Sequence, residues 1–335
     1  MTFAVYNAAQ VPVDVSLTDP GTGGVYAELE DLGPGTTRPL QVDFGSGSYA
    51  FQCDTGYGNP LNGPAIVVPG DAAGGLAVAP PDATAALAAV SGDHAYISAG
   101  LATVAGQVSA LESDIAAGDL GAARGAWLTA HLSWERLGSA YGMFGDYDDE
   151  IDGTPDGLPG GVNDPSWTGF YRIEYGLWHG QPATGLAGPA SQLSHDVQAL
   201  RAAYPGMATY PQAALSDLAL RTHEVMEHTI RFQLSGEDDF GSGTTLATAA
   251  ANIDATRAQL GMLQPMLAGQ YSALPQVYTW LSRLQGLIDA ERTGSGWTPV
   301  SALTPAQRED INSAAAETVQ LLAPIAVMFE SSPQP

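Results

Sequence analysis

Hydrophobic and polar positions alternate along the first 80 residues in short runs that are typical of β-strands. Between residues 11 and 17, Val or Leu alternates with Pro, Asp or Ser, as expected of a strand with one buried face. Such runs, separated by turns rich in Gly, Pro, Asn and Asp, predict a small β-sandwich. The predicted strands cover residues 3–6, 11–17, 38–44, 48–53 and 65–68.

The pattern changes at Pro80-Pro81, beyond which apolar residues recur at helical spacing. Two helix starts are marked: Asp119 is a predicted N-cap, and Thr304 with Gln307 forms a predicted capping box. We therefore predict a β-sandwich over residues 1–80 and an all-α helix bundle over 81–335. Two stacked four-helix units are one arrangement of the bundle that these helices allow. The predicted helices cover residues 82–117, 120–143, 189–204, 210–235, 243–270, 275–292 and 304–330.

One stretch between the predicted helices, residues 145–188, is acidic and rich in Gly and Pro. We predict a long irregular loop there, and loops of that length inside compact bundles are often functional. Asp148, Glu150, Asp152 and Gly153 imitate the start of a calcium-binding EF-hand loop. The twelfth position from Asp148 is Pro159 instead of Glu, so that motif fails. One of these acids could still fold back onto the bundle.

The charge of the chain narrows the choice of partner. The formal net charge is −25, and every basic residue is Arg. Nucleic acid is excluded as a default partner because phosphate binding needs clustered basic residues, and an anionic membrane surface is disfavoured for the same reason. The negative charge is compatible with binding of cations or cationic partners, and also with a role in solubility alone.

Targeting signals and membrane spans are not predicted. The chain contains no apolar run of about 18 residues, so we expect no transmembrane span. The N-terminus lacks the basic and apolar regions of a signal peptide, and we expect any leader to have been removed from this chain.

Two pairs of residues have the spacing of metal ligands. His131 and Glu135 share a helical face at i and i+4, and His223 and Glu227 do the same. Helix bundles build carboxylate-rich metal sites from inward-facing residues of this kind, and Glu224 adds another carboxylate. The alternative is a pair of solvated helix faces, since charged residues mostly lie on the surface.

Two other features have structural interpretations. Arg172 and Glu174 lie in an aromatic-rich run, where burial demands pairing and favours a structural ion pair. Cys53 is the single cysteine, and no His precedes His94. A blue-copper site needs a Cys and two His, so copper in the N-terminal part is disfavoured and Cys53 is predicted to be a small buried residue.

A resemblance to a known family rests on several long motifs. They run from His131 through Gly142, from Gly157 to Val162, from Thr168 to Trp178, from His223 to Glu227 and from Leu234 to Thr244. Over residues 81–330 the chain resembles the imelysin-like domain of the iron-binding component of Efe-type ferrous iron uptake systems. The N-terminal part is similar to the cupredoxin-like domain of the longer members.

The resemblance implies a cation site in the bundle. By resemblance, the ligands are His131, Glu135 and Asp148, completed by Glu224 or Glu227, with Glu227 preferred because it shares a face with His223. Iron, as Fe(II) or Fe(III), is the implied ion, and zinc also suits these ligands. Tyr171, Arg172, Glu174 and His223 are implied to surround the site. The implied location is extracytoplasmic, periplasmic or at the cell surface. The implied partners are a membrane iron permease and a haem peroxidase of the same uptake system.

One departure from the family bears on catalysis. The family's Gly-x-His-x-x-Glu motif keeps Gly169 and Glu174, but Tyr171 replaces the His. The Tyr171 phenol is a candidate ligand for ferric iron. No His-Glu-x-x-His zinc motif is present, which disfavours a peptidase. We therefore expect a non-catalytic protein that captures iron and delivers it to a permease. An imelysin-type metallopeptidase and a metal-free interaction module remain the alternatives.

Overall fold

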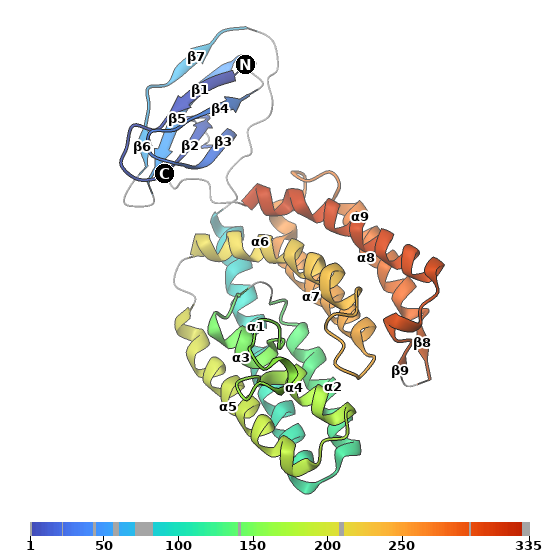
Figure 1. The fold of residues 1–335 in the computed structure, drawn as a ribbon. Coiled ribbons are helices and arrows are strands. Elements are labelled where there is room, and N and C mark those ends of the chain that lie inside the picture. Colours follow the sequence, from blue (N-terminus) through green and yellow to red (C-terminus); the bar gives the residue numbers. More distant parts are fainter. Residues whose placement is uncertain are drawn as a thin grey trace. The chain divides into compact units, whose positions relative to one another are not determined.

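The structure, a computed structural model, divides into two compact units (Figure 1). One comprises residues 1–83 with 328–335, and the other residues 84–327. The described residues are 2–21, 23–42, 45–55, 60–70, 83–139, 142–207, 211–294 and 296–329. The predicted boundary at residue 80 lies outside them, between the last strand of the first unit and the first helix of the second.

The first unit is built from antiparallel strands. β1 pairs with β4, and a larger sheet has the order β3-β2-β5-β6, with β7 also paired to β5. Leu17, Leu40 and Tyr49 come from both sheets and share one buried core. The strands are β1 (Thr2–Tyr6), β2 (Val13–Thr18), β3 (Val25–Leu32), β4 (Thr37–Gln41), β5 (Gly47–Asp54), β6 (Leu61–Asn62) and β7 (Ile66–Val68). The sequence pattern missed β3 and β6. In β3, Glu28 and other acids interrupt the apolar alternation.

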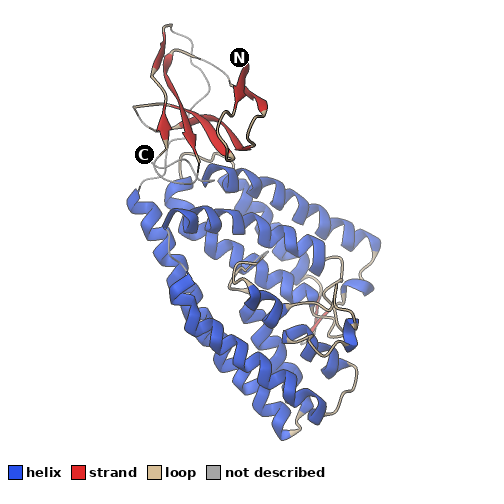
Figure 2. Ribbon diagram, turned by 60° about the vertical axis from the view of Figure 1, so that its left-hand side comes forward, coloured by secondary structure: helices blue, strands red, loops and turns tan. Residues whose placement is uncertain are grey.

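The second unit is helical, apart from the short hairpin of β8 (Arg292–Thr293) and β9 (Gly296–Trp297) (Figure 2). Within the described residues it contains α1 (Ala83–Ala117), α2 (Leu120–Glu135), α3 (Asp146–Asp152), α4 (Gly169–Trp178), α5 (Ala183–Met207), α6 (Pro211–His228), α7 (Thr245–Leu267), α8 (Leu274–Asp289) and α9 (Pro305–Phe329). α2 packs against α4 and α7, and α3 packs against α4 and α5. A large core contains Trp127, Phe170 and other residues of α1 to α5.

The prediction of one long irregular loop over 145–188 is only partly correct, because helices occupy much of the stretch and the irregular part is mainly residues 153–168. The stretch contains α3, a 3-10 turn (Gly161–Asn163), α4 and the start of α5. α3 has seven residues with three acids in its first turn, which favour a helix N-terminus but conceal its apolar periodicity. α5 also begins earlier than predicted and continues through Pro189.

Both predicted helix starts are confirmed. The Asp119 carboxylate accepts a hydrogen bond from the Ala122 amide at 2.9 Å. Thr304 and Gln307 form the reciprocal bonds of a capping box. The Asp119 cap matters for the site because it begins α2, whose buried face carries Trp127, His131 and Trp134.

Removing the α2 cap should have a measurable cost. Asp119→Ala is expected to lower the free energy of unfolding by about 1 kcal/mol, because it leaves a helix amide without its acceptor. Denaturant unfolding followed by circular dichroism measures the loss. Asp114→Ala, which removes the same charge from the end of α1, is the control. An equal loss in that variant would assign the effect to charge instead of capping.

α9 is, among the described helices, the one that is long and apolar enough to cross a membrane by length and composition. This is weak evidence for a span, because core helices pass the same test. The buried positions Ile311, Leu322 and Ile325 fall on one stripe of the helix. The Tyr271 hydroxyl donates to the Leu321 carbonyl at 2.6 Å and fixes α9 to the segment before α8.

Candidate metal centre

The α2 pair predicted from sequence lies inside the helical unit. His131 Nε2 is 3.1 Å from Oε1 of Glu135, one turn further along the same helix. Their side chains are only 2% and 9% exposed, so the alternative of a solvated helix face does not hold. A buried imidazole facing a carboxylate at this distance is a pair that can share a cation.

A third ligand-type residue comes from α3. Oδ1 of Asp152 lies 3.3 Å from His131 Nε2, and the Asp152 side chain is 19% exposed. One ligand atom each from His131, Glu135 and Asp152 lie within 4.8 Å of one another. In a tetrahedral zinc site with bonds of about 2.0 to 2.1 Å, ligand atoms are separated by about 3.4 Å. The three side chains are therefore close to the spacing that an ion would impose.

Aromatic rings position the imidazole. The Trp127 ring stacks on His131 with centroids 4.9 Å apart, and Trp127 Nε1 donates to the Phe170 carbonyl at 2.9 Å. Phe170 and Tyr171, from α4, contact other sides of the imidazole at 5.3 and 5.2 Å. These rings exclude water and hold His131 where the two carboxylates meet it.

The electrostatics of the centre favour a positive charge. Burial lowers the pKa of His131, but Asp152 and Glu135 outweigh it and raise that pKa to about 10. Burial raises the pKa of Asp152 to about 7 even though His131 opposes the shift. Burial also raises the pKa of Glu174 to about 7. Without an ion, the imidazolium thus supplies the positive charge that the carboxylates require.

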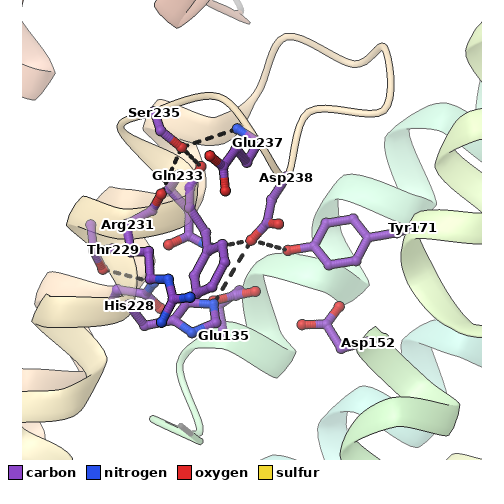
Figure 3. Close-up of polar contacts among 12 residues, drawn as sticks. Glu135, Asp152, Tyr171, His228, Thr229, Arg231, Gln233, Ser235, Glu237 and Asp238 are labelled. Carbon is purple, nitrogen blue, oxygen red and sulfur yellow. Dashed lines mark hydrogen bonds and ion pairs between the residues drawn. The ribbon is translucent and has the colours of Figure 1, made fainter. Parts of the chain in front are cut away.

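A neighbouring group of side chains surrounds Asp238 (Figure 3). Asp238 Oδ2 accepts from Gln233 Nε2 at 3.0 Å and from the Tyr171 hydroxyl at 3.3 Å. The same oxygen lies 3.8 Å from His228 Nε2. Burial, together with the nearby charges of Asp152 and Glu135, raises the pKa of Asp238 to about 7. The carboxylates of Glu135 and Asp152 and the Tyr171 hydroxyl point toward one another below Asp238 (Figure 3).

Asp148, the predicted third ligand, is directed away from the His131 group. One of its oxygens accepts from the Ser139 hydroxyl at 2.7 Å and the other from the Phe144 amide at 2.6 Å. Asp148 and Asp152 share a face of α3 one turn apart, and Asp152 is the residue that reaches His131. Asp148 instead ties α3 to the segment that follows α2.

The predicted α6 residues do not join the His131 group either. Glu227 is exposed and His223 is half-buried. Burial raises the pKa of Glu224, with smaller effects from Glu227, Arg221 and Asp217. These residues form a charged face of α6, and the contribution of α6 to the site comes from His228 at its last position.

The predicted ion pair between Arg172 and Glu174 does not form. Arg172 Nη2 donates to Gln181 at 3.0 Å, while Glu174 Oε1 accepts from the Ser242 amide at 2.9 Å. The two side chains are two positions apart on α4 and so point to different sides of the helix. Glu174 is 1% exposed, and its Oε2 has no hydrogen-bond partner within the described part of the chain.

The imelysin (peptidase M75) family model matches residues 93–325, which include every residue of the His131 and Asp238 groups. The chain belongs to the imelysin family. This confirms the resemblance in the helical unit, and the family's helical domain agrees with the nine described helices. Curated relatives of the chain include the "Iron uptake system component EfeO" of Yersinia pestis, which is 27% identical over 285 residues. That alignment covers 85% of this chain and 74% of the relative. The protein of the same name from Escherichia coli (strain K12) is 26% identical over 286 residues with the same coverage.

Asp152, His228 and Asp238 belong to the candidate site in the structure but were not among the site residues predicted from sequence. Asp152 belongs to the acidic run that contains Asp148. Its position four residues after Asp148, on the same helical face, was the sequence feature that could have identified it as a site residue. Asp238 lies in a Gly-rich acidic segment that resembles an exposed turn in sequence, although it is 5% exposed in the fold. His228 lies four positions after Glu224, so helical spacing was an available signal, but only the neighbouring pair of His223 and Glu227 was selected from it.

Proposed function

We propose that this imelysin-family protein captures iron at His131, Glu135 and Asp152 and delivers it to a membrane permease. The observation that carries the proposal is the buried imidazole with two carboxylate oxygens at 3.1 and 3.3 Å. Relatives named as components of an iron uptake system support iron as the ion. Imidazole and carboxylate ligands suit iron, and they also suit zinc.

Capture exchanges a proton for the ion. His131 holds a proton at neutral pH because the carboxylates raise its pKa, and a metal ligand must be deprotonated. Binding therefore releases the imidazolium proton, and acid favours release of the ion. This gives a route for unloading at a partner that supplies protons or competing ligands.

The wider setting of the proposal follows the relatives. We place the protein outside the cytoplasm, in the periplasm or at the cell surface, with a membrane permease and a haem peroxidase as partners. The strand-rich first unit is proposed to be cupredoxin-like. In its described residues Cys53 is half-buried, and burial raises the pKa of its thiol, which suits a packing role better than copper ligation.

Calorimetric titration of the full chain with Fe(II) under anaerobic conditions, and with Zn(II), tests the proposal. The double variant His131→Ala, Glu135→Ala is expected to lose at least about 100-fold in affinity, since it removes two of three ligands. His223→Ala, Glu227→Ala is the matched control, because it removes the same residue types at the same helical spacing from α6. Unchanged binding in the first variant, or equal loss in the control, would contradict the site assignment.

A further inference from the structure

The segment after α6 brings new polar side chains to the site. α6 ends at His228 and continues into a π-helical turn, Thr229–Gln233. π-Helical turns are rare and often occur at functional sites. Here the turn is fixed by the Thr229 hydroxyl, which donates to the Val225 carbonyl at 2.7 Å and accepts from Asn252 at 3.0 Å. It places Gln233 beside Asp238, to whose carboxylate Gln233 donates (Figure 3).

Asp238 is held with one oxygen facing three polar side chains. Gln233 and Tyr171 donate to Oδ2, and His228 Nε2 stands 3.8 Å from the same atom. That last distance is too long for a hydrogen bond, and it exceeds the roughly 3.4 Å between tetrahedral ligand atoms by only a few tenths of an ångström. Gln233, which is fully buried, fixes the orientation of the carboxylate.

The second group adjoins the first through Glu135. Glu135 contacts His131 directly, and its charge also acts on the pKa of His228 and of Asp238. Figure 3 shows the Glu135 carboxylate beside the His228 ring. The two groups therefore lie on either side of one carboxylate.

The carboxylates of the site divide between two groups of side chains. Glu135 and Asp152 face His131, whereas Asp238 faces His228 and Tyr171. An ion held at His131 therefore leaves the Asp238 carboxylate available to a second cation.

We propose that Asp238, His228 and Tyr171 hold a second cation beside the one at His131, with Glu135 between the two. This rests on the proposed function, because it takes the His131 group as the first ion position. A phenolate, a carboxylate and an imidazole form a ligand set for a hard trivalent cation, and we assign Fe(III) to it. Tyr171 loses its phenol proton to solvent when it binds the ion.

Metal analysis of the full chain after loading with iron in air and desalting tests the proposal. The wild-type protein is expected to retain two iron ions per chain, and Asp238→Asn and His228→Gln one. Glu237→Gln is the control, because it makes the same kind of change at the exposed neighbour of Asp238. One ion in the wild type, or two in both variants, would overturn the second position. No ion in the wild type would overturn the proposed function as well.

A spectroscopic readout separates ligation from a structural role of Tyr171. Iron bound to a phenolate gives a visible charge-transfer band, which the wild-type protein should show only after the second ion is added. Tyr171→Phe should lose the band and keep the first ion. Tyr175→Phe, one turn along α4 where the ring stacks on His179, should keep the band. A band that persists in Tyr171→Phe would exclude Tyr171 as a ligand.

Discussion

The cation-free protein is expected to unfold at a lower temperature at pH 8 than at pH 5.5, and a bound ion is expected to remove most of the difference. Asp152, Glu174 and Asp238 have their pKa values raised to about 7 in the fold, above the values of about 4 for unfolded chains. Between about pH 4 and about pH 7, the folded state therefore binds more protons than the unfolded state. Stability therefore falls as pH rises through this range.

Loss of the His131 imidazolium proton also lowers the stability of the fold as pH rises, but at higher pH values. The pKa of His131 is raised in the fold to about 10, so its contribution is fully present below the unfolded value of about 6.5. That contribution is lost as pH rises toward 10. A bound cation replaces the lost protons as the positive charge among the carboxylates.

Thermal unfolding by calorimetry, with chelator and with excess Zn(II), measures both effects. Free ligand at 100 times its dissociation constant adds about 2.7 kcal/mol, which is a rise in Tm of about 5 to 10 °C for a domain of this size. The His131→Ala, Glu135→Ala variant is the control and should gain much less from zinc. A Tm that rises from pH 5.5 to pH 8 without metal would contradict the electrostatic account.

Gly169→Ala is expected to be the most damaging single substitution near the site. Gly169 begins α4 with φ of +88°, and an added Cβ would lie 2.4 Å from the Ile151 carbonyl oxygen. The strained backbone and the clash with α3 together should cost about 3 to 4 kcal/mol. Cation affinity should fall too, because relief of the clash separates α3, which carries Asp152, from α4, which carries Tyr171.

Gly157→Ala distinguishes strain from collision. Gly157 has φ of +83°, but nothing lies within 4 Å of its added Cβ. That variant should lose only about 1 to 2 kcal/mol and keep its cation affinity. Denaturant unfolding and zinc titration of both variants provide the comparison. Equal losses in the two would show that the close approach of α3 and α4 does not matter.

The local part of the site was predictable from sequence, and the rest was not. His131 and Glu135 were found because an i, i+4 pair on one helix needs no tertiary information. The choice between Asp148 and Asp152 depends on how α3 docks, and both residues lie on the same helical face. Sequence favoured Asp148, while the docking of α3 directs Asp148 to Ser139 and brings Asp152 to His131.

The contacts of Asp238 could not be predicted from sequence, because they join distant parts of the chain. Tyr171 and Asp238 are 67 positions apart in the chain, and no periodicity connects them. The same reason explains β3, whose apolar face is defined by its partner β2 and is interrupted by acids along its own sequence. Helix caps, by contrast, depend on three or four neighbouring residues, and both predicted caps are present.

The order of the site residues along the chain also affects how the site forms during synthesis. His131, Glu135 and Asp152 lie within 22 residues, whereas Asp238 follows Asp152 by 86 residues. A growing chain therefore completes α2 and α3 well before the π-helical turn and Asp238 emerge from the ribosome. The three ligands proposed for the first ion are therefore synthesised before the segment that carries Asp238. We thus expect the first proposed ion position to form before the second.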